Sequence, residues 1–177
     1  LKRFIQCVAV YPARYAVRIT GDNPFTDFDI LAKMFRRMKR GLTTFINNYP
    51  FAAGGSVGVT AFNWSPLLYS PFRTTPQPLL TAVNSIQSFG GTHVTNAFLD
   101  PIAGGIPLLS RLQSKLRRVL VMVTDALPSD VLPFQADSII VAAKAERVEI
   151  HMVILGVPAS LDIQRICKET GGQFYDM

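Results

Sequence analysis

Short apolar runs alternate along the chain with longer stretches in which apolar residues recur every three or four positions. Four of the short runs have the length and the β-branched residues of strands buried in a sheet. These runs span 4–10, 56–63, 118–124 and 149–155. Two further strands are predicted at 66–72, where the prolines suit a sheet edge, and at 173–177.

The longest stretch with a helical repeat predicts an amphipathic helix over 26–48. Its apolar residues recur every three or four positions from Leu31 to Ile46. Thr26 and Asp29 have the spacing of a capping box, which would satisfy free N–H groups in the first turn. Further helices are predicted at 76–89, 95–104, 108–116, 134–148 and 160–169.

This order of elements predicts an α/β fold. Strands that alternate with helices indicate a mainly parallel sheet with helices on both faces. A length of 177 residues is ordinary for one domain with a single core. Binding sites of such sheets form at the carboxyl ends of the strands, so the loops after Val10, Asn63 and Thr124 are the first places to search.

The composition excludes several classes of protein. Hydrophobic residues make up 49% of the chain and charged residues 17%, which argues against disorder. No apolar run approaches the roughly 20 residues that cross a bilayer. The two cysteines, Cys7 and Cys167, offer neither a disulfide framework nor a zinc spacing, so we expect reduced core residues. The chain begins at Leu1, and we expect a domain of a longer protein.

Charge is distributed unevenly along the chain. No Asp or Glu occurs from Ile30 to Leu99. The same stretch contains a cluster that predicts a basic face on the first helix, namely Lys33, Arg36, Arg37, Lys39 and Arg40, with Arg73 farther along. Such asymmetry indicates an acidic partner or nucleic acid, and the alternative is a solvated helix face.

Catalytic and nucleotide-binding motifs are absent from the sequence. The first apolar run is not followed by GxGxxG, and neither GxxxxGK[ST] nor GxSxG occurs. The only histidines are His93 and His151, and neither has the serine and acid spacing of a catalytic triad. We therefore expect a protein that is not an enzyme and that needs no organic cofactor.

Two residues could ligate a divalent cation. Thr92 and Asp125 each lie near the end of a predicted element, and hard cations such as Mg²⁺ prefer oxygen ligands. If the ends of adjacent strands bring these residues together, they supply a hydroxyl and a carboxylate.

Four segments in order resemble the von Willebrand factor type A domain, the inserted domain of integrins. The segments are 57-VGVTAF-62, 90-GGTHVTNAF-98, 119-VLVMVTDA-126 and 166-ICKETGGQFYDM-177. The resemblance implies one domain over 1–177, with a three-layer Rossmann-like sandwich and a six-stranded, mostly parallel sheet whose third strand is antiparallel. It also implies a metal-ion-dependent adhesion site that uses Thr92 and Asp125.

The sequence departs from this family in the first metal motif. Aligned after the predicted first strand, the family's DxSxS falls on Tyr11, Ala13 and Tyr15, none of which carries a carboxylate. We therefore expect Thr92 and Asp125 to be remnants that hold no metal ion tightly. The alternative is a site rebuilt with ligands from the next loop, which offers Asp22, Asp27 and Asp29.

Without a cation, the carboxylate of Asp125 needs another partner if it is buried. We predict that Arg14, or Arg18 beyond it, pairs with this carboxylate. The alternative is that Asp125 caps its own loop and faces water.

The sequence thus predicts a metal-independent module for protein interaction or scaffolding. The residues expected to bind a partner are Tyr11, Arg14, Tyr15, Trp64, Thr92, His93 and Asp125, with Phe25 and Tyr69 as further aromatic candidates. Two alternatives remain open. One is a metal-dependent adhesion domain with rebuilt ligands, and the other is a nucleic-acid-associated domain similar to those of transcription and repair complexes.

Overall fold

The computed structural model describes residues 14–20, 28–87, 93–113, 116–124, 131–155 and 158–176, with side chains from 33 onward except that of Met34. The strands are β1 (Arg14–Thr20), β2 (Val57–Phe62), β3 (Pro66–Arg73), β4 (Arg118–Thr124), β5 (Val148–Ile154) and β6 (Phe174–Asp176). The helices are α2 (Phe28–Asn48), the short 3₁₀ helix η1 (Phe51–Ala53), α3 (Pro76–Ser85), α4 (Val94–Leu99), α5 (Gly105–Ser110), α6 (Pro133–Ala145) and α7 (Leu161–Glu169).

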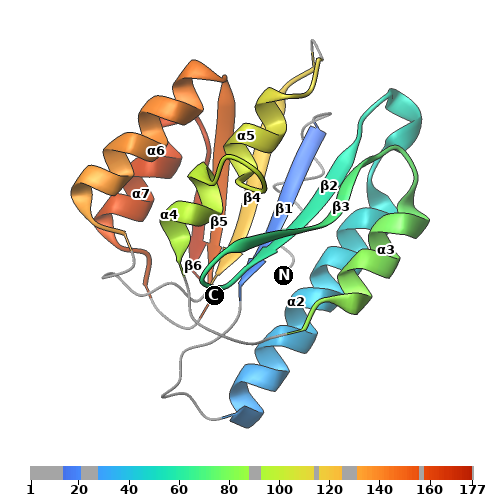
Figure 1. The fold of residues 1–177 in the computed structure, drawn as a ribbon. Coiled ribbons are helices and arrows are strands. Elements are labelled where there is room, and N and C mark those ends of the chain that lie inside the picture. Colours follow the sequence, from blue (N-terminus) through green and yellow to red (C-terminus); the bar gives the residue numbers. More distant parts are fainter. Residues whose placement is uncertain are drawn as a thin grey trace.

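The strands form one six-stranded sheet in the order β3-β2-β1-β4-β5-β6 (Figure 1). Neighbouring strands are parallel except β2 and β3, which are antiparallel. The antiparallel strand therefore lies at a sheet edge, and its prolines, Pro66 and Pro71, are tolerated there because an edge strand needs fewer ladder donors. The α/β class predicted from the alternation of elements is confirmed.

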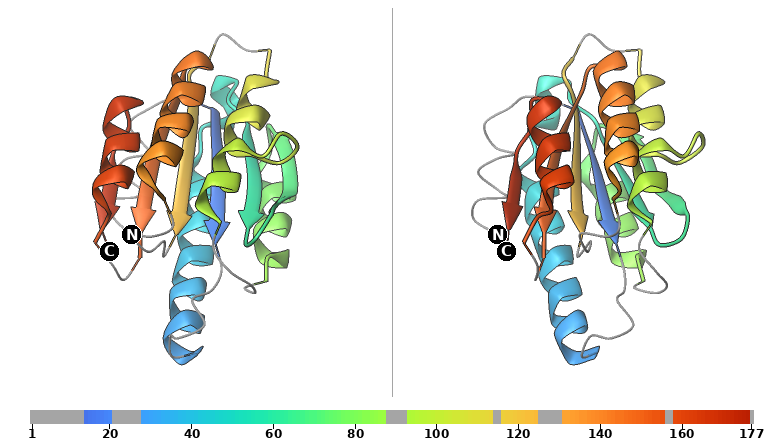
Figure 2. Two further views of the ribbon diagram at one scale, coloured as in Figure 1. Left: turned by 60° about the vertical axis from the view of Figure 1, so that its left-hand side comes forward. Right: turned by 90° about the vertical axis from the view of Figure 1, so that its left-hand side faces the viewer.

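Helices cover both faces of the sheet (Figure 2). Strand β4 shows why: Val119, Val121 and Val123 pack with α2 and α3 in one buried cluster, whereas Leu120 and Met122 pack in a second cluster with α4, α5, α6 and α7. Because side chains of a strand alternate between faces, a continuous apolar run such as this one serves both cores.

The first strand differs from the prediction. It was predicted at 4–10, which lies outside the described residues, whereas the described strand β1 is Arg14–Thr20 and pairs with both β2 and β4. The run at 4–10 is more apolar than RYAVRIT, and apolar pattern alone favoured it. Residues 14–20 form the strand because their backbone pairs in register with both β2 and β4.

The expected helix over 95–104 is also shorter than predicted. It ends at Leu99, and the carboxylate oxygen Oδ1 of Asp100 then accepts N–H groups from Ile102 at 3.0 Å and Ala103 at 2.8 Å. This turn and Pro101 end the helix, since proline cannot continue its hydrogen bonds. The next helix, predicted at 108–116, is α5 and spans Gly105–Ser110 instead.

Candidate protein-binding surfaces

Three neighbouring strands end at one edge of the sheet, which we call the carboxyl-end face. Strand β1 lies between β2 and β4, and the three end at Thr20, Phe62 and Thr124. Thr20 is paired with Phe62, and Ile19 with Val123, so the ends are level. These strand ends therefore lie side by side, and the carboxyl ends of parallel strands are where binding sites usually form.

The alignment of DxSxS with Tyr11, Ala13 and Tyr15 is wrong. Tyr15 is the second residue of β1, where it pairs with Val57 and Val119, and it does not lie in the loop after the strand. Five more residues separate it from Thr20, or about 16 Å at 3.3 Å per residue. Tyr11 and Ala13 lie outside the described residues. The segment that follows β1 is 21–27, which contains Asp22 and Asp27.

The predicted ion pair between Arg14 and Asp125 is wrong for the same reason. Arg14 pairs with Arg118 at the amino end of β4, and Asp125 follows Thr124 at its carboxyl end. Six residues of strand separate the two ends, about 20 Å, which is farther than an arginine side chain reaches. Arg18 pairs with Met122, nearer that end, but its side chain lies outside the described residues, so its pairing stays a prediction.

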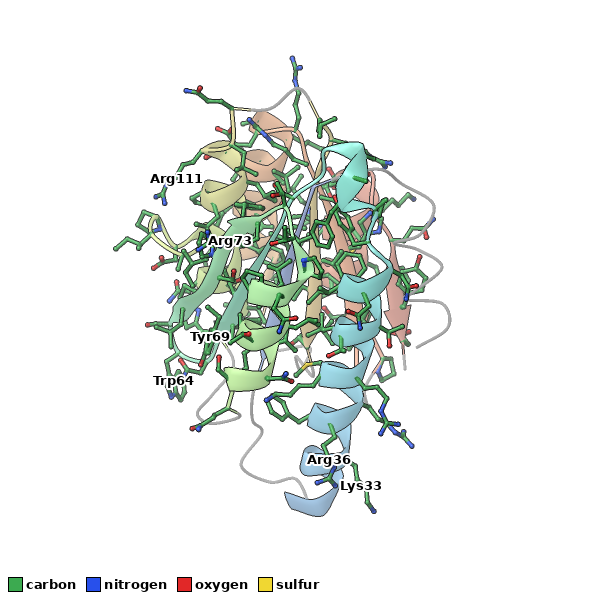
Figure 3. The ribbon with its side chains drawn as sticks, turned by 90° about the vertical axis from the view of Figure 1, so that its right-hand side faces the viewer. Lys33, Arg36, Trp64, Tyr69, Arg73 and Arg111 are labelled. Atoms are coloured by element: carbon green, nitrogen blue, oxygen red, sulfur yellow. The ribbon has the colours of Figure 1, made fainter. Side chains whose placement is uncertain are left out.

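A tight turn at the carboxyl-end face presents Trp64 to solvent. The turn joins β2 to β3, and within it the N–H of Ser65 donates to Oδ1 of Asn63 at 3.1 Å. Trp64 is 67% exposed, although tryptophan is usually well buried. Figure 3 shows its side chain at the turn before β3, away from the body of the domain. It is the single tryptophan of the chain.

Helix α4 holds this turn in place. The N–H of His93 donates to the carbonyl of Asn63 at 2.9 Å, and Nδ2 of Asn96 donates to the carbonyl of Trp64 at 3.4 Å. His93 is also the N-cap of α4, where its Nδ1 accepts the N–H of Asn96 at 3.4 Å. The predicted partner-binding residues Trp64 and His93 therefore lie on adjoining elements, although 29 positions apart in the sequence.

The remaining predicted site residues cannot be placed. Thr92, Asp125, Asp22, Asp27 and Phe25 lie outside the described residues, as do Thr26 of the capping box and Cys7, and the side chain of Asp29 is not described. Within the described ranges, no three His, Cys, Asp or Glu side chains are grouped as a metal site requires. Asp22 and Asp125 nevertheless follow the ends of the adjacent strands β1 and β4 closely in sequence. Two carboxylates suit a hard cation better than the residues Tyr11, Ala13 and Tyr15 of the wrong alignment.

Four of the five basic residues of α2 lie on one exposed face, and Lys39 does not. Lys33, Arg36, Arg37 and Arg40 are exposed, whereas Lys39 points to α3. The Lys39 ammonium donates to the carbonyl of Asn84 at 2.8 Å and lies 4.9 Å from the ring centroid of Phe35. Partial burial lowers the pKa of Lys39. Lys39 therefore joins two helices, and the exposed basic surface is smaller than predicted.

A second polar cluster lies at the opposite, amino ends of β4 and β5. A cleft of about 600 Å³ is lined by Leu116, Arg117, Arg118, Ala145, Glu146, Arg147 and Glu149. Arg117 forms a two-pronged ion pair with Glu149, and Arg118 contacts the Glu146 carboxylate at 3.2 Å and three backbone carbonyls. Arg117, just before β4, is thus joined to β5, and Arg118, the first residue of β4, is joined to the turn after α6. These contacts indicate a structural role.

His151 extends this cluster into the interior, and it should make stability depend on pH. The side chain is 5% exposed, its Nδ1 accepts the N–H of Gln173 at 3.3 Å, and burial lowers its pKa below the usual 6.5, with Glu149 opposing and Arg117 adding to the shift. The unfolded chain therefore binds a proton first as the pH falls, so the free energy of unfolding should decrease below about pH 6.5. Above that value the group contributes no pH dependence.

Urea unfolding at pH values on either side of this range measures the effect. In a His151→Gln variant, which keeps an acceptor but cannot titrate, the decrease between about pH 7.5 and 5.5 should be smaller than in the parent protein. An unchanged pH dependence in this variant would contradict the assignment to His151.

Cys167 is not a nucleophile. It lies on α7 with 0% exposure, and burial raises the pKa of its thiol to about 12. A thiol with so high a pKa carries almost no thiolate near neutral pH, and thiolate is the reactive form. The prediction that Cys167 is a reduced core residue is confirmed. Separately, no described helix is both long enough and apolar enough to cross a membrane.

The sheet order and helix layers are those of the von Willebrand factor type A fold. A structure described as von Willebrand factor type A from Catenulispora acidiphila matches with a TM-score of 0.73 and 12% identity, over 93% of this chain and 38% of that chain. The conserved hypothetical protein BatB from Bacteroides thetaiotaomicron matches with 0.69 and 16%, over 93% and 90%. The vWF domain of the type V pili tip protein Mfa5 from Porphyromonas gingivalis matches with 0.66 and 10%, over 94% and 90%.

At these identities the likeness shows the fold alone, and it confirms at that level the resemblance inferred from the four segments. No protein-family model matches the sequence, and no curated protein matches it.

Proposed function

We propose that this domain is a non-catalytic protein-binding module whose contact surface is the carboxyl-end face around Trp64. The observation that carries the proposal is the exposed Trp64 side chain on a turn that is hydrogen-bonded to α4. A large aromatic side chain on a rigid support loses little entropy on binding, and tryptophan is among the residues that most often dominate protein interfaces.

Neighbouring residues support this surface. Leu67 and Leu68 on β3 are 49% and 44% exposed, so apolar area continues from the turn onto the edge strand. Tyr69 is half-buried beside them. Thr92 directly precedes His93 in the sequence, and Asp125 directly follows Thr124. Both are proposed to contact the same partner. Arg14 and Tyr15 are not part of this surface, because they lie at the other end of β1.

A photo-crosslinking residue in place of Trp64 tests the proposal. The expected result is a discrete adduct with one protein in a native extract. The matched control places the same residue at Val141, which is 68% exposed in the second half of α6, toward the amino ends of the strands. Equal adducts from both positions, or none from position 64, would refute the proposal.

The second candidate function is cation-dependent adhesion at the same face. The observation in its favour is the end of β1 at Thr20. The segment that follows in the sequence contains Asp22 and Asp27, so the argument for a dismantled site no longer holds. Together with Thr92 and Asp125 these residues would supply oxygen ligands for Mg²⁺, which would in turn accept an acidic side chain of the partner.

Thermal unfolding in EDTA, and then in millimolar Mg²⁺ or Mn²⁺, decides between metal-independent and cation-dependent binding. A cation at a hundred times its dissociation constant would add about 2.7 kcal/mol to the free energy of unfolding. A shift that is lost in an Asp125→Ala variant would favour the cation-dependent module. If no shift occurs, binding through Trp64 proceeds without metal. Emission from Trp64 reports on the same face in the same samples.

A further inference from the structure

The whole net charge of the protein comes from one part of its chain. The stretch from Ile30 to Leu99 contains six Lys or Arg residues and no Asp or Glu. The rest of the chain holds twelve residues of each sign, so the formal net charge of +6 belongs to this stretch. It forms most of α2 and all of β2, β3, α3 and α4. Figure 1 shows α2, β2, β3 and α3 together on one side of the domain.

Most of these cations form a single row on α2, which we call the basic stripe: Lys33, Arg36, Arg37 and Arg40. Their spacing of three, four and seven positions places them on one face of a helix. The opposite face packs on the sheet through Met38, Leu42, Phe45 and Ile46. All four stripe residues are exposed, and none of their side chains has a hydrogen bond or ion pair with another described residue.

The basic stripe also projects from the domain. In Figures 1 and 2, the first turns of α2 extend past the carboxyl ends of the strands. Figure 3 shows Lys33 and Arg36 pointing outward from this end. Lys33 and Arg40 lie seven positions apart, or about 10 Å along the helix axis. It is therefore accessible to another molecule that approaches the carboxyl-end face from the side of α2.

We propose that the basic stripe binds an acidic segment of a partner protein. The proposal rests on the protein-binding function above and names the chemistry of the partner: several Asp or Glu residues that face the stripe. Guanidinium groups suit this role because they hold carboxylates in two-pronged hydrogen bonds. Three of the four stripe residues are arginines.

The contacts of Lys39 define where the segment lies. Its ammonium is hydrogen-bonded to the carbonyl of Asn84, which ties α2 to α3. A partner segment therefore lies along the outer face of α2 and not between the two helices. No exposed residue of α3 is charged, and Gln77, Thr81 and Asn84 are polar, so no acidic residue there repels the segment.

The surroundings of the stripe favour a protein over a nucleic acid. Proteins that bind single strands stack bases on exposed aromatic rings, and those that bind duplexes tightly contact about six to ten phosphates. On α2, Phe35 lies beneath Lys39, and Phe45 is buried. The exposed ring of Trp64 stands on the turn after β2, apart from the stripe (Figure 3). Four cations with no exposed aromatic side chain beside them on the described part of α2 match a short acidic segment better.

A labelled helical peptide with Glu at four positions spaced like the stripe tests the proposal by fluorescence anisotropy. We expect binding to the parent protein, weakening as salt rises, and no binding of the same peptide with Gln in place of Glu. In an Arg36→Glu/Arg37→Glu variant, affinity should fall by about tenfold or more, because two attractions become repulsions. Lys33 is left unchanged, since it lies four residues after Asp29.

The control variant is Arg147→Glu/Lys168→Glu, which makes the same change in net charge at exposed positions away from α2. It should keep the affinity of the parent protein for the peptide. An equal loss in both variants would show a general charge effect and overturn the proposal. So would tighter binding of a DNA duplex or single-stranded RNA than of the peptide at the same salt. If the peptide does not bind but crosslinking at position 64 still gives a discrete adduct, only the role of the basic stripe is refuted, and the protein-binding function stands.

Discussion

Replacing Phe98 by alanine should lower the free energy of unfolding by about 3–5 kcal/mol, the range for a large aromatic side chain removed from a core. Phe98 is fully buried in the cluster between the sheet and α4, α5, α6 and α7. Helix α4 has only six residues, so Phe98 is a large part of what attaches it to the sheet. Urea unfolding followed by circular dichroism measures the loss.

The matched control for this substitution is Phe134→Ala. Phe134 is 64% exposed, and substitutions at such positions usually change stability by about 0.5 kcal/mol or less. Equal losses in the two variants would contradict the assignment of Phe98 to the core. Because α4 also holds the Trp64 turn, Phe98→Ala should in addition change the Trp64 emission of the folded protein.

Gly172→Ala should lower the free energy of unfolding by about 3 kcal/mol, which is the upper end of the usual cost of overpacking a core. A Cβ atom at Gly172 would stand 1.8 Å from the carbonyl oxygen of Ile150 and 2.5 Å from its carbon. These are backbone atoms of β5, so neither can rotate away. The turn after α7 must shift, and with it the start of β6. Thermal or urea unfolding of the purified variant measures the effect.

The neighbouring glycine separates this clash from backbone strain. Gly171 has a φ of +82°, and a Cβ there would meet only Glu149, at 3.8 Å. Gly171→Ala should therefore cost about 1–2 kcal/mol, from the left-handed conformation alone. A larger loss for Gly171→Ala than for Gly172→Ala would contradict the clash.

Much of the fold could be predicted from the sequence because its signals are local. The run 119–123 is apolar throughout, as a strand with two buried faces requires. In the described part of the helical repeat, Met38, Leu42, Phe45 and Ile46 are buried against the sheet as predicted. The first strand could not be predicted in this way. Two candidate runs, 4–10 and 14–20, precede α2, and only pairing with distant strands distinguishes them. Because the run 4–10 was taken as the first strand, the family's DxSxS motif was aligned with residues near the amino end of β1, and not with those after Thr20.

The candidate site was harder to predict than the fold for a similar reason. Trp64 and His93 were both predicted from the sequence as partner-binding residues. The sequence did not indicate that a hydrogen bond from His93 to Asn63 joins α4 to the turn that carries Trp64. The spacing of Lys33, Arg36, Arg37 and Arg40 was available in the sequence and already separates them from Lys39. The contact of Lys39 with Asn84 spans 45 positions, and no local pattern indicates it.

The confinement of the net charge to one side of the domain has a kinetic consequence. A body that is positive at α2 and balanced elsewhere has a large electric dipole moment, so the field of an acidic partner turns it during approach. Collisions then begin with α2 foremost, next to the carboxyl-end face, and a larger share of them lead to a complex. Association with an acidic partner should therefore be fast at low ionic strength, while the lifetime of the complex depends on the contacts made afterwards.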